Sequence, residues 1–289
     1  MPQRIQKLLA QIKQQEKEIT EGIITEKDCL KSLKSLSNGK TPGVDGLTTD
    51  FYKFFWADIK DLVLSSINYA FQKGEMSNDQ KLAVISLLPK KDKIRVLLKN
   101  RRPITLLTVD YKLIAKSLAS RLEKILPSFI YETQFGYVKD RYIGENIRCV
   151  MDINDLCAIK KIPALALQID FEKAFDSLRW RYLHTVLQEF NFGPEFCKWI
   201  EIIYKDCESS VMINGNTCPW FSPSRGIRQG FPFSAYLFIL CVEPLAQYIR
   251  LRDNIRGITI NNNLCKLVQY VDDMTCLLND PDSVSEVLQ

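Results

Sequence analysis

Apolar residues recur every three or four positions along several stretches of the chain, and this spacing predicts helices. The predicted helices span residues 1–35, with a break before a second short helix, and 51–74, 111–126, 142–160, 177–190, 192–206 and 233–252. Side-chain oxygens of Thr and Asp accept hydrogen bonds from the first turn of a helix, so such residues at these starts predict N-caps. They are Thr25 with Asp28, Thr49 with Asp50, and Asp110.

Shorter apolar runs bounded by Pro, Gly or Asn predict strands, with a loop between them at residues 37–50. The strand-like runs span residues 82–93, 101–110, 164–171, 257–263 and 264–280, and an Asn-Gly pair at 214–215 predicts a hairpin. Alternation along 164–171 places Leu165, Leu167 and Ile169 on one face, and Gln168 and Asp170 on the other.

Two adjacent carboxylates, Asp272 and Asp273, interrupt the apolar run that ends at Leu278. Burying an unpaired carboxylate costs free energy, so a hairpin with these acids at its tip is the favoured interpretation. Asp170 also follows a predicted strand, and acids gathered at strand ends repel one another unless a cation lies among them. Mg²⁺ suits such a site, because it binds carboxylate oxygens and keeps positions for water and phosphate. The alternative is that each acid lies in a solvated turn or caps a helix.

Composition narrows the class of protein. With 289 residues, 46% of them hydrophobic, the chain can bury the core of one large domain or two. No run of 18 apolar residues occurs, so a membrane span is not expected. Residues 1–20 are polar and charged, so a secretory leader is not expected either. Nine cysteines at scattered spacings, without a CxxC pair, argue against a disulfide framework or a zinc site. His184 is the only histidine, which argues against a histidine base.

Positive charge is concentrated in one part of the chain. Residues 85–148 carry 14 Lys or Arg against six Asp or Glu, whereas the whole chain has a net charge of only +5. A basic block beside a more acidic remainder indicates a polyanionic partner that one part of the molecule contacts. The alternative is an ordinary solvated surface rich in Lys.

Several segments, in order, resemble the motifs of reverse transcriptases. Three resemble the palm motifs: QIDFEKAFDSL (168–178), GIRQGFPFSAYLF (226–238) and YVDDM (270–274). Upstream segments resemble the fingers motifs (87–93 and 100–122) and two segments of the non-LTR, LINE-type branch (39–56 and 133–147). The resemblance covers residues 24–280, and the ordered set is far more specific than any one motif.

The resemblance implies a role for each acid and for the aromatic residues beside them. Asp170 and Asp272 match the two metal-ligating aspartates, and Asp273 matches the adjacent catalytic acid. The backbone carbonyl of Phe171 would complete a metal shell of two Mg²⁺ ions, with Mn²⁺ as an alternative. Phe175 matches the aromatic residue that selects deoxynucleotides by blocking a 2′-hydroxyl; its alternative is core packing.

The same comparison implies contacts to the incoming nucleotide and the template. Arg102, and either Lys90 or Lys91, match residues that hold the triphosphate, and a planar guanidinium suits phosphate oxygens. The alternative is that these residues belong to an ordinary solvated loop. Further matches are Gln229 and Gly230, beside the nascent base pair, and Gln134, Phe135 and Gly136, on the template side.

The resemblance also implies a fold and a division of the chain. The fold is α+β, that of a right-hand polymerase, whose palm is an antiparallel sheet backed by helices in a split βαβ arrangement. The expected parts are an N-terminal helical extension (1–35), a fingers region (36–150) and a palm region (151–289). Because the chain ends soon after Asp273, no thumb is expected, and weak or no activity is expected of this chain alone.

An RNA template, a DNA primer and dNTPs are the implied partners, with neither a membrane nor an obligate protein partner, inside the cell in the cytoplasm or nucleus. Two alternatives stay open. One is a group II intron-type reverse transcriptase or maturase, which shares PGVDG and the palm motifs. The other is a non-catalytic nucleic-acid-binding remnant. DFYKFFW (50–56) and DYKLIAKSLASRL (110–122) favour the LINE-type branch, and the intact acids argue against a remnant.

Overall fold

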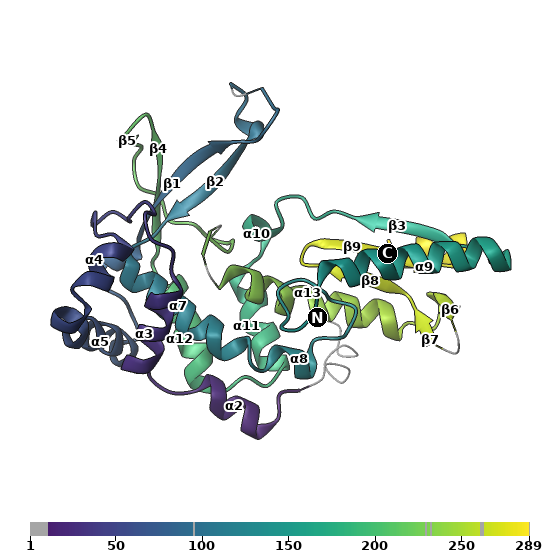
Figure 1. The fold of residues 1–289 in the computed structure, drawn as a ribbon, viewed down its shortest axis with the longest axis horizontal. Coiled ribbons are helices and arrows are strands. Elements are labelled where there is room, and N and C mark those ends of the chain that lie inside the picture. Colours follow the sequence, from purple (N-terminus) through teal and green to yellow (C-terminus); the bar gives the residue numbers. More distant parts are fainter. Residues whose placement is uncertain (1–10, 95, 229, 232, 261–262, 289) are drawn as a thin grey trace.

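The computed structural model describes residues 11–94, 96–228, 230–231, 233–260 and 263–288. It shows an α+β fold with three separate sheets (Figure 1). The strands are β1 (Leu82–Pro89), β2 (Arg101–Leu106), β3 (Leu165–Ile169), β4 (Glu208–Ile213), β5 (Asn216–Thr217), β6 (Ile258–Ile260), β7 (Asn263–Cys265), β8 (Leu267–Tyr270) and β9 (Asp273–Leu278).

Helices fill the space between and below the sheets. In the N-terminal half they are α2 (Gln14–Thr20), α3 (Glu26–Ser35), α4 (Thr49–Phe54), α5 (Trp56–Lys73), α6 (Asn78–Lys81), the short 3₁₀ helix η1 (Leu98–Asn100), α7 (Val109–Leu122), α8 (Leu126–Phe129) and α9 (Ile143–Lys160). In the C-terminal half they are α10 (Ala174–Ser177), α11 (Trp180–Glu189), α12 (Pro194–Tyr204), α13 (Ser234–Leu251) and α14 (Pro281–Val287).

The first sheet has the strand order β2-β1-β4-β5 and projects from one end of the molecule (Figure 1). β1 pairs antiparallel with β2 and parallel with β4, so a strand from the C-terminal half completes a sheet begun in the N-terminal half. The predicted hairpin at Asn214-Gly215 is confirmed: both residues have positive φ, 52° and 83°, as a two-residue turn requires.

The second sheet has the order β3-β9-β8 and is wholly antiparallel. Leu167 and Ile169 pack into a core cluster, and Gln168 and Asp170 are exposed, so the predicted alternation is confirmed for the second half of this strand. Leu165, predicted on the same face as Leu167, is 40% exposed, so the prediction is wrong at the start of the strand. α9 and α13 lie alongside this sheet (Figure 1), and both contact β8.

The N-cap predictions had mixed outcomes. Thr25 caps α3 as expected, since its side chain accepts a hydrogen bond from the Asp28 N–H. The prediction of Thr49 with Asp50 is wrong, because Thr48 caps α4 and Thr49 is already a buried helical residue. Asp110 is also not a cap: α7 begins at Val109, after Thr108.

Two long predicted helices are interrupted. The one predicted over 51–74 is broken at Phe55, whose φ and ψ of −95° and 12° separate α4 from α5. The one predicted over 177–190 starts only at Trp180, because Leu178 is extended after α10. The helix predicted over 111–126 ends at Leu122, and Pro127 lies in the first turn of α8.

One large hydrophobic cluster joins the N-terminal helices to α7, α11, α12 and the first part of α13. Two smaller clusters lie on either side of the three-stranded sheet. All nine cysteines are free thiols, as predicted. No helix in the described part of the chain is long and apolar enough to cross a membrane.

Candidate active site

The predicted hairpin with acids at its tip is present. Tyr270 pairs with Asp273 at the end of β8 and β9, so Val271 and Asp272 form the turn. β3 pairs with β9 up to Ile169 opposite Met274, and Asp170 follows in the next position. This register brings Asp170 beside the hairpin tip, although about 100 residues separate the two segments in the sequence.

Mutual repulsion among the acids is visible at Asp272. Burial raises the pKa of the Asp272 carboxyl above its usual 3.8, and the nearby negative charges of Asp273 and Asp170 raise it further. Asp170 and Asp273 are exposed, so all three carboxylates form one acidic edge open to solvent on one side. Among the described residues, no three His, Cys, Asp or Glu side chains are gathered closely enough to hold a metal ion by themselves.

Gln134 holds the turn from beneath. Its side chain accepts hydrogen bonds from the N–H of Val271 at 3.0 Å and of Gly136 at 2.9 Å, and it donates to the Val271 carbonyl at 3.4 Å. Gln134 was predicted to lie on the template side, but it is 0% exposed. Its observed partner is therefore the turn that carries Asp272.

The neighbours of Gln134 follow the same path along the hairpin. Phe135 donates its backbone N–H to the Gln269 carbonyl at 2.9 Å and is half-buried beside a small core cluster. A Cβ on Gly136 would lie 2.5 Å from the Val271 side chain, so only glycine permits this approach.

The two aromatic residues after Asp170 pack toward the core. The Phe171 carbonyl accepts a hydrogen bond from the Ala174 N–H at 3.2 Å, which leaves its second lone pair for another partner. Phe175 is half-buried, and its ring lies 5.0 Å from that of Phe238 in α13. Core packing, the alternative role considered for Phe175, is thus part of what it does.

The basic residues predicted to hold a triphosphate lie at the free end of the first sheet. Lys90 and Lys91 follow β1, and Arg102 lies in β2 opposite Leu88. All three side chains are exposed. The backbone N–H of Lys90 donates to the Asn100 carbonyl at 2.8 Å, which closes the base of the connecting loop.

The loop that precedes α13 is anchored by α10 and α11. Gly226 donates its N–H to the Leu178 carbonyl and Ile227 donates to the Phe175 carbonyl, each at 2.7 Å. The Trp180 indole N–H donates to the Gly226 carbonyl at 2.8 Å. Gly230, at φ +83°, approaches the Ile104 side chain of β2, whereas Gln229 lies outside the described residues.

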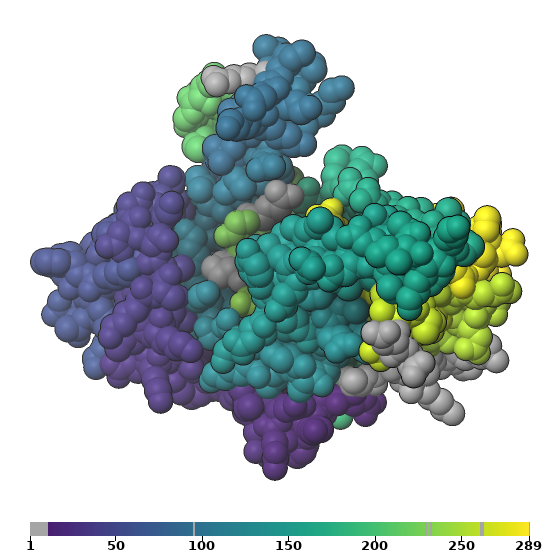
Figure 2. Space-filling view, turned by 45° about the vertical axis from the view of Figure 1, so that its right-hand side comes forward, coloured from purple at the N-terminus to yellow at the C-terminus, as the bar shows by residue number. Residues whose placement is uncertain are grey.

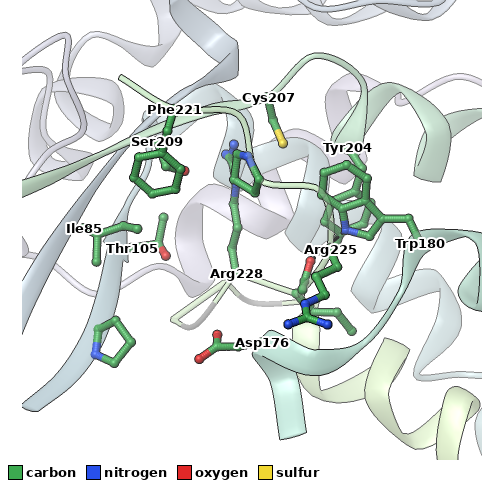
Figure 3. Close-up of a pocket in the computed structure, with 14 residues that line it drawn as sticks. Ile85, Thr105, Asp176, Trp180, Tyr204, Cys207, Ser209, Phe221, Arg225 and Arg228 are labelled. Carbon is green, nitrogen blue, oxygen red and sulfur yellow. Dashed lines mark hydrogen bonds between the residues drawn. The ribbon is translucent and has the colours of Figure 1, made fainter. Parts of the chain in front are cut away.

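Trp180 and Arg228 were missed by the sequence analysis. Arg228 stacks over the Tyr111 ring at 5.1 Å and donates to the Lys81 carbonyl at 3.1 Å, so it ties the same loop to the start of β1. Figure 3 shows both side chains in the pocket between the sheet and the helices. The adjacent Gly226 and Gln229 were recognisable from their motif, but these long-range contacts have no local sequence pattern.

The chain is similar in sequence to known proteins. Residues 88–289 match the family model described as reverse transcriptase (RNA-dependent DNA polymerase). An uncharacterised 149 kDa protein of transposon TX1 from Xenopus laevis is 34% identical over 271 residues, which are 93% of this chain and 20% of that protein.

Two further relatives come from Drosophila melanogaster. The retrovirus-related Pol polyprotein of the type-2 retrotransposable element R2DM is 25% identical over 87% of this chain and 23% of its own length. A 115 kDa protein of the type-1 element R1DM is 23% identical over 86% of this chain and 22% of its own length. The chain thus spans about a fifth of the length of these relatives.

Proposed function

This chain belongs to the reverse transcriptase family, and from that membership we propose that it extends DNA primers on RNA templates as part of a non-LTR, LINE-type retrotransposon protein. The observation that carries the proposal is the position of Asp170 beside the Val271-Asp272 turn. This position brings Asp170 near Asp272 and Asp273, and we propose that these three acids form the catalytic site.

Reverse transcriptases generally use divalent metal ions, and the acids here fit Mg²⁺ or Mn²⁺. Mg²⁺ is usually held by one or two carboxylates, with waters and substrate phosphates completing its shell. Asp170 and Asp272 would supply these carboxylates, and the Phe171 carbonyl has a free lone pair. When bound, two such ions would stabilise the attacking and the leaving oxygens of phosphoryl transfer.

The remaining residues would orient the substrates. Lys90, Lys91 and Arg102 would bind the triphosphate of a dNTP, since their exposed charges lie together at the end of the first sheet. The primer 3′-hydroxyl attacks the α-phosphate, a new P–O bond forms, and the bond to the β-phosphate breaks to release pyrophosphate.

Shape would provide the selectivity of this site. The Phe175 ring, fixed against Phe238, would exclude a ribose 2′-hydroxyl. Gly230, with Gln229 before it, would lie beside the nascent base pair. Phe135 and Gly136 would lie on the template side, while Gln134 positions Asp272 from below.

The parts of a right-hand polymerase can be assigned on this basis. The four-stranded sheet would be the core of the fingers (36–150), and the antiparallel sheet that carries the acids would be the palm (151–289), with a helical extension at 1–35. Because β4 pairs with β1, the proposed palm range contributes a strand to the sheet of the proposed fingers, so the two parts do not divide cleanly along the sequence.

Asp272→Asn tests the proposal, because it keeps the shape of the side chain and removes its charge. We expect primer extension on an RNA template by a longer protein that contains this chain to fall by at least about 100-fold. RNA affinity should stay nearly constant. Asp282→Asn, an exposed change elsewhere, is the control. Normal extension by Asp272→Asn would show that the metal assignment is wrong.

A further inference from the structure

Three arginines surround a hollow at the start of α11. Arg179, Arg181 and Arg225 line it together with Trp180 and Ser224. All three arginine side chains are exposed. None of them forms an ion pair with any residue that the structure describes, so their charges are not neutralised within this part of the chain.

The start of α11 adds to this positive field. Arg179 occupies the N-cap position without a side-chain hydrogen bond to the first turn, and that turn contains no acid. Backbone N–H groups at a helix start carry partial positive charge and attract anions. The field of the helix and the charges of the arginines therefore favour the same kind of partner, a polyanion.

Trp180 gives the hollow a rigid aromatic wall. Its indole ring stacks on Tyr204, with centroids 5.4 Å apart, and donates a hydrogen bond to the Gly226 carbonyl. Trp180 and Arg225 also line a deeper cavity of about 150 Å³, which Phe221 borders on another side (Figure 3). Phe221 is 46% exposed, so a second aromatic surface is accessible there.

The hollow and the deeper cavity share Trp180 and Arg225, and together they are called the groove. The groove is distinct from the nucleotide site proposed above. Successive side chains of a strand point to opposite faces of the sheet. Pro103 and Thr105 of β2 line the deeper cavity, so Arg102, which directly precedes Pro103, points to the other face. A ligand in the groove would therefore leave Arg102 free for a triphosphate.

We propose that this groove binds single-stranded RNA at a site separate from the catalytic acids. Arginines would contact successive phosphates, and bases would stack against Trp180 and Phe221, the combination by which proteins hold unpaired strands. A duplex fits less well, because its bases are already stacked on one another. Asp176 borders the inner cavity, so the phosphates lie over the outer rim, where the arginines are.

Fluorescence anisotropy with an unstructured RNA oligonucleotide, without primer, tests the site in the whole chain. The triple variant Arg179→Ala, Arg181→Ala, Arg225→Ala should weaken binding, and the slope of log Kd against log salt should fall by about 2, because each phosphate contact in a single strand contributes roughly 0.7. The triple Arg→Lys variant keeps the charges, so it should retain the slope.

A matched control removes three exposed charges elsewhere: Lys27→Ala, Lys31→Ala, Lys34→Ala on α3. An equal loss of slope in this control would show that only net charge matters, and an unchanged slope in the arginine variant would exclude the site. Crosslinking with RNA that contains 4-thiouridine should label the peptides around 179–181 and 221–225. Labelling confined to other segments would overturn the proposal. Because no step requires polymerisation, failure here leaves the Asp272→Asn test of the proposed function unaffected.

Discussion

At the scale of single residues, the conformation of Val271 decides where Asp272 lies. Val271 has φ +58°, a region that costs a β-branched residue on the order of 1–3 kcal/mol. The buried Gln134 amide offsets this cost by pairing with both the N–H and the carbonyl of Val271, as a neighbouring strand would. The turn that carries Asp272 therefore depends on a side chain from a segment far upstream.

Gln134→Met tests this dependence, because methionine has a similar length and forms neither hydrogen bond. We expect kcat for primer extension and the affinity for Mn²⁺, measured by electron paramagnetic resonance, each to fall roughly 10- to 100-fold, as for residues that orient metal ligands. KM for dNTP should change little, since the residues proposed to bind the triphosphate lie on the other sheet. The exposed change Gln188→Met is the control. Unaltered Mn²⁺ affinity would contradict the positioning role.

Phe175 offers a second prediction at this scale, which concerns the choice of sugar. Phe175→Ala would open space at the ring that now packs on Phe238, so a ribonucleotide should be accepted roughly tenfold more readily relative to its deoxy form. Competitive incorporation of rNTP and dNTP measures the ratio. Phe54→Ala removes a ring that is 81% exposed and should leave the ratio unchanged. The same ratio in both variants would assign Phe175 to packing alone.

At the scale of elements, α7 holds the N-terminal segment through one side chain. The Arg121 guanidinium, 8% exposed, donates to the backbone carbonyls of residues 20–23 and to the Asp28 carboxylate at 2.8 Å. In the same segment, the Glu21 carboxylate accepts the N–H groups of Glu195 and Phe196 at the start of α12. Segments far apart in the sequence thus satisfy one another's polar groups.

Arg121→Ala should lower the free energy of unfolding by roughly 2–4 kcal/mol, because it leaves partly buried carbonyls and the Asp28 carboxylate without this donor. Urea denaturation followed by circular dichroism measures the change. Arg148→Ala is the control, since its ion pair with Asp152 lies on the surface and should contribute less than about 1 kcal/mol. Similar losses in the two variants would mean that burial of Arg121 is unimportant.

Local patterns predicted most elements but not their interruptions. Alternation along β3 and the Asn-Gly turn depend on neighbours in the sequence, and both were predicted. The break between α10 and α11 depends on the hydrogen bond from the distant Gly226 to Leu178, which no local pattern contains. Thr48, Thr49 and Asp50 can all cap a helix, and burial of Thr49 decided among them.

In the candidate site, too, the features that depend on sequence neighbours were predicted and those that depend on distant contacts were not. The hairpin tip with Asp272 was predicted, because its flanking apolar runs are local. The partner of the tip was not, because Gln134 was assigned to the template side. Trp180, which anchors the loop before α13, was not singled out either. The arginine groove was also missed, since the basic block was placed at residues 85–148, whereas Arg179 and Arg225 meet only after folding.

At the scale of the whole molecule, the core is unevenly distributed. The large cluster unites α7, α12 and the first part of α13, while the sheet that carries the acids depends mainly on two smaller clusters. Figure 2 shows the first sheet standing out from the body at the top of the view. The largest part of the core thus lies outside the hairpin that carries Asp272. α13 joins the large cluster to a smaller one, with Ile239 in the first and Ile249 in the second.

Hydrogen exchange followed by mass spectrometry should therefore show a gradient. Amides of α7 and α12 should exchange slowest, because these helices lie in the large core cluster, and β8 and β9 should exchange faster, because they lie in the two smaller clusters. The exposed loop that begins at Lys90 should exchange fastest. Added Mn²⁺ should slow exchange in residues 267–278, since a ligand that binds only the folded site stabilises it. The Asp272→Asn variant should lose this response while its α7 and α12 remain protected. A hairpin as protected as α7 without metal, or an equal response to Mn²⁺ in the variant, would contradict this account of how the molecule supports its acids.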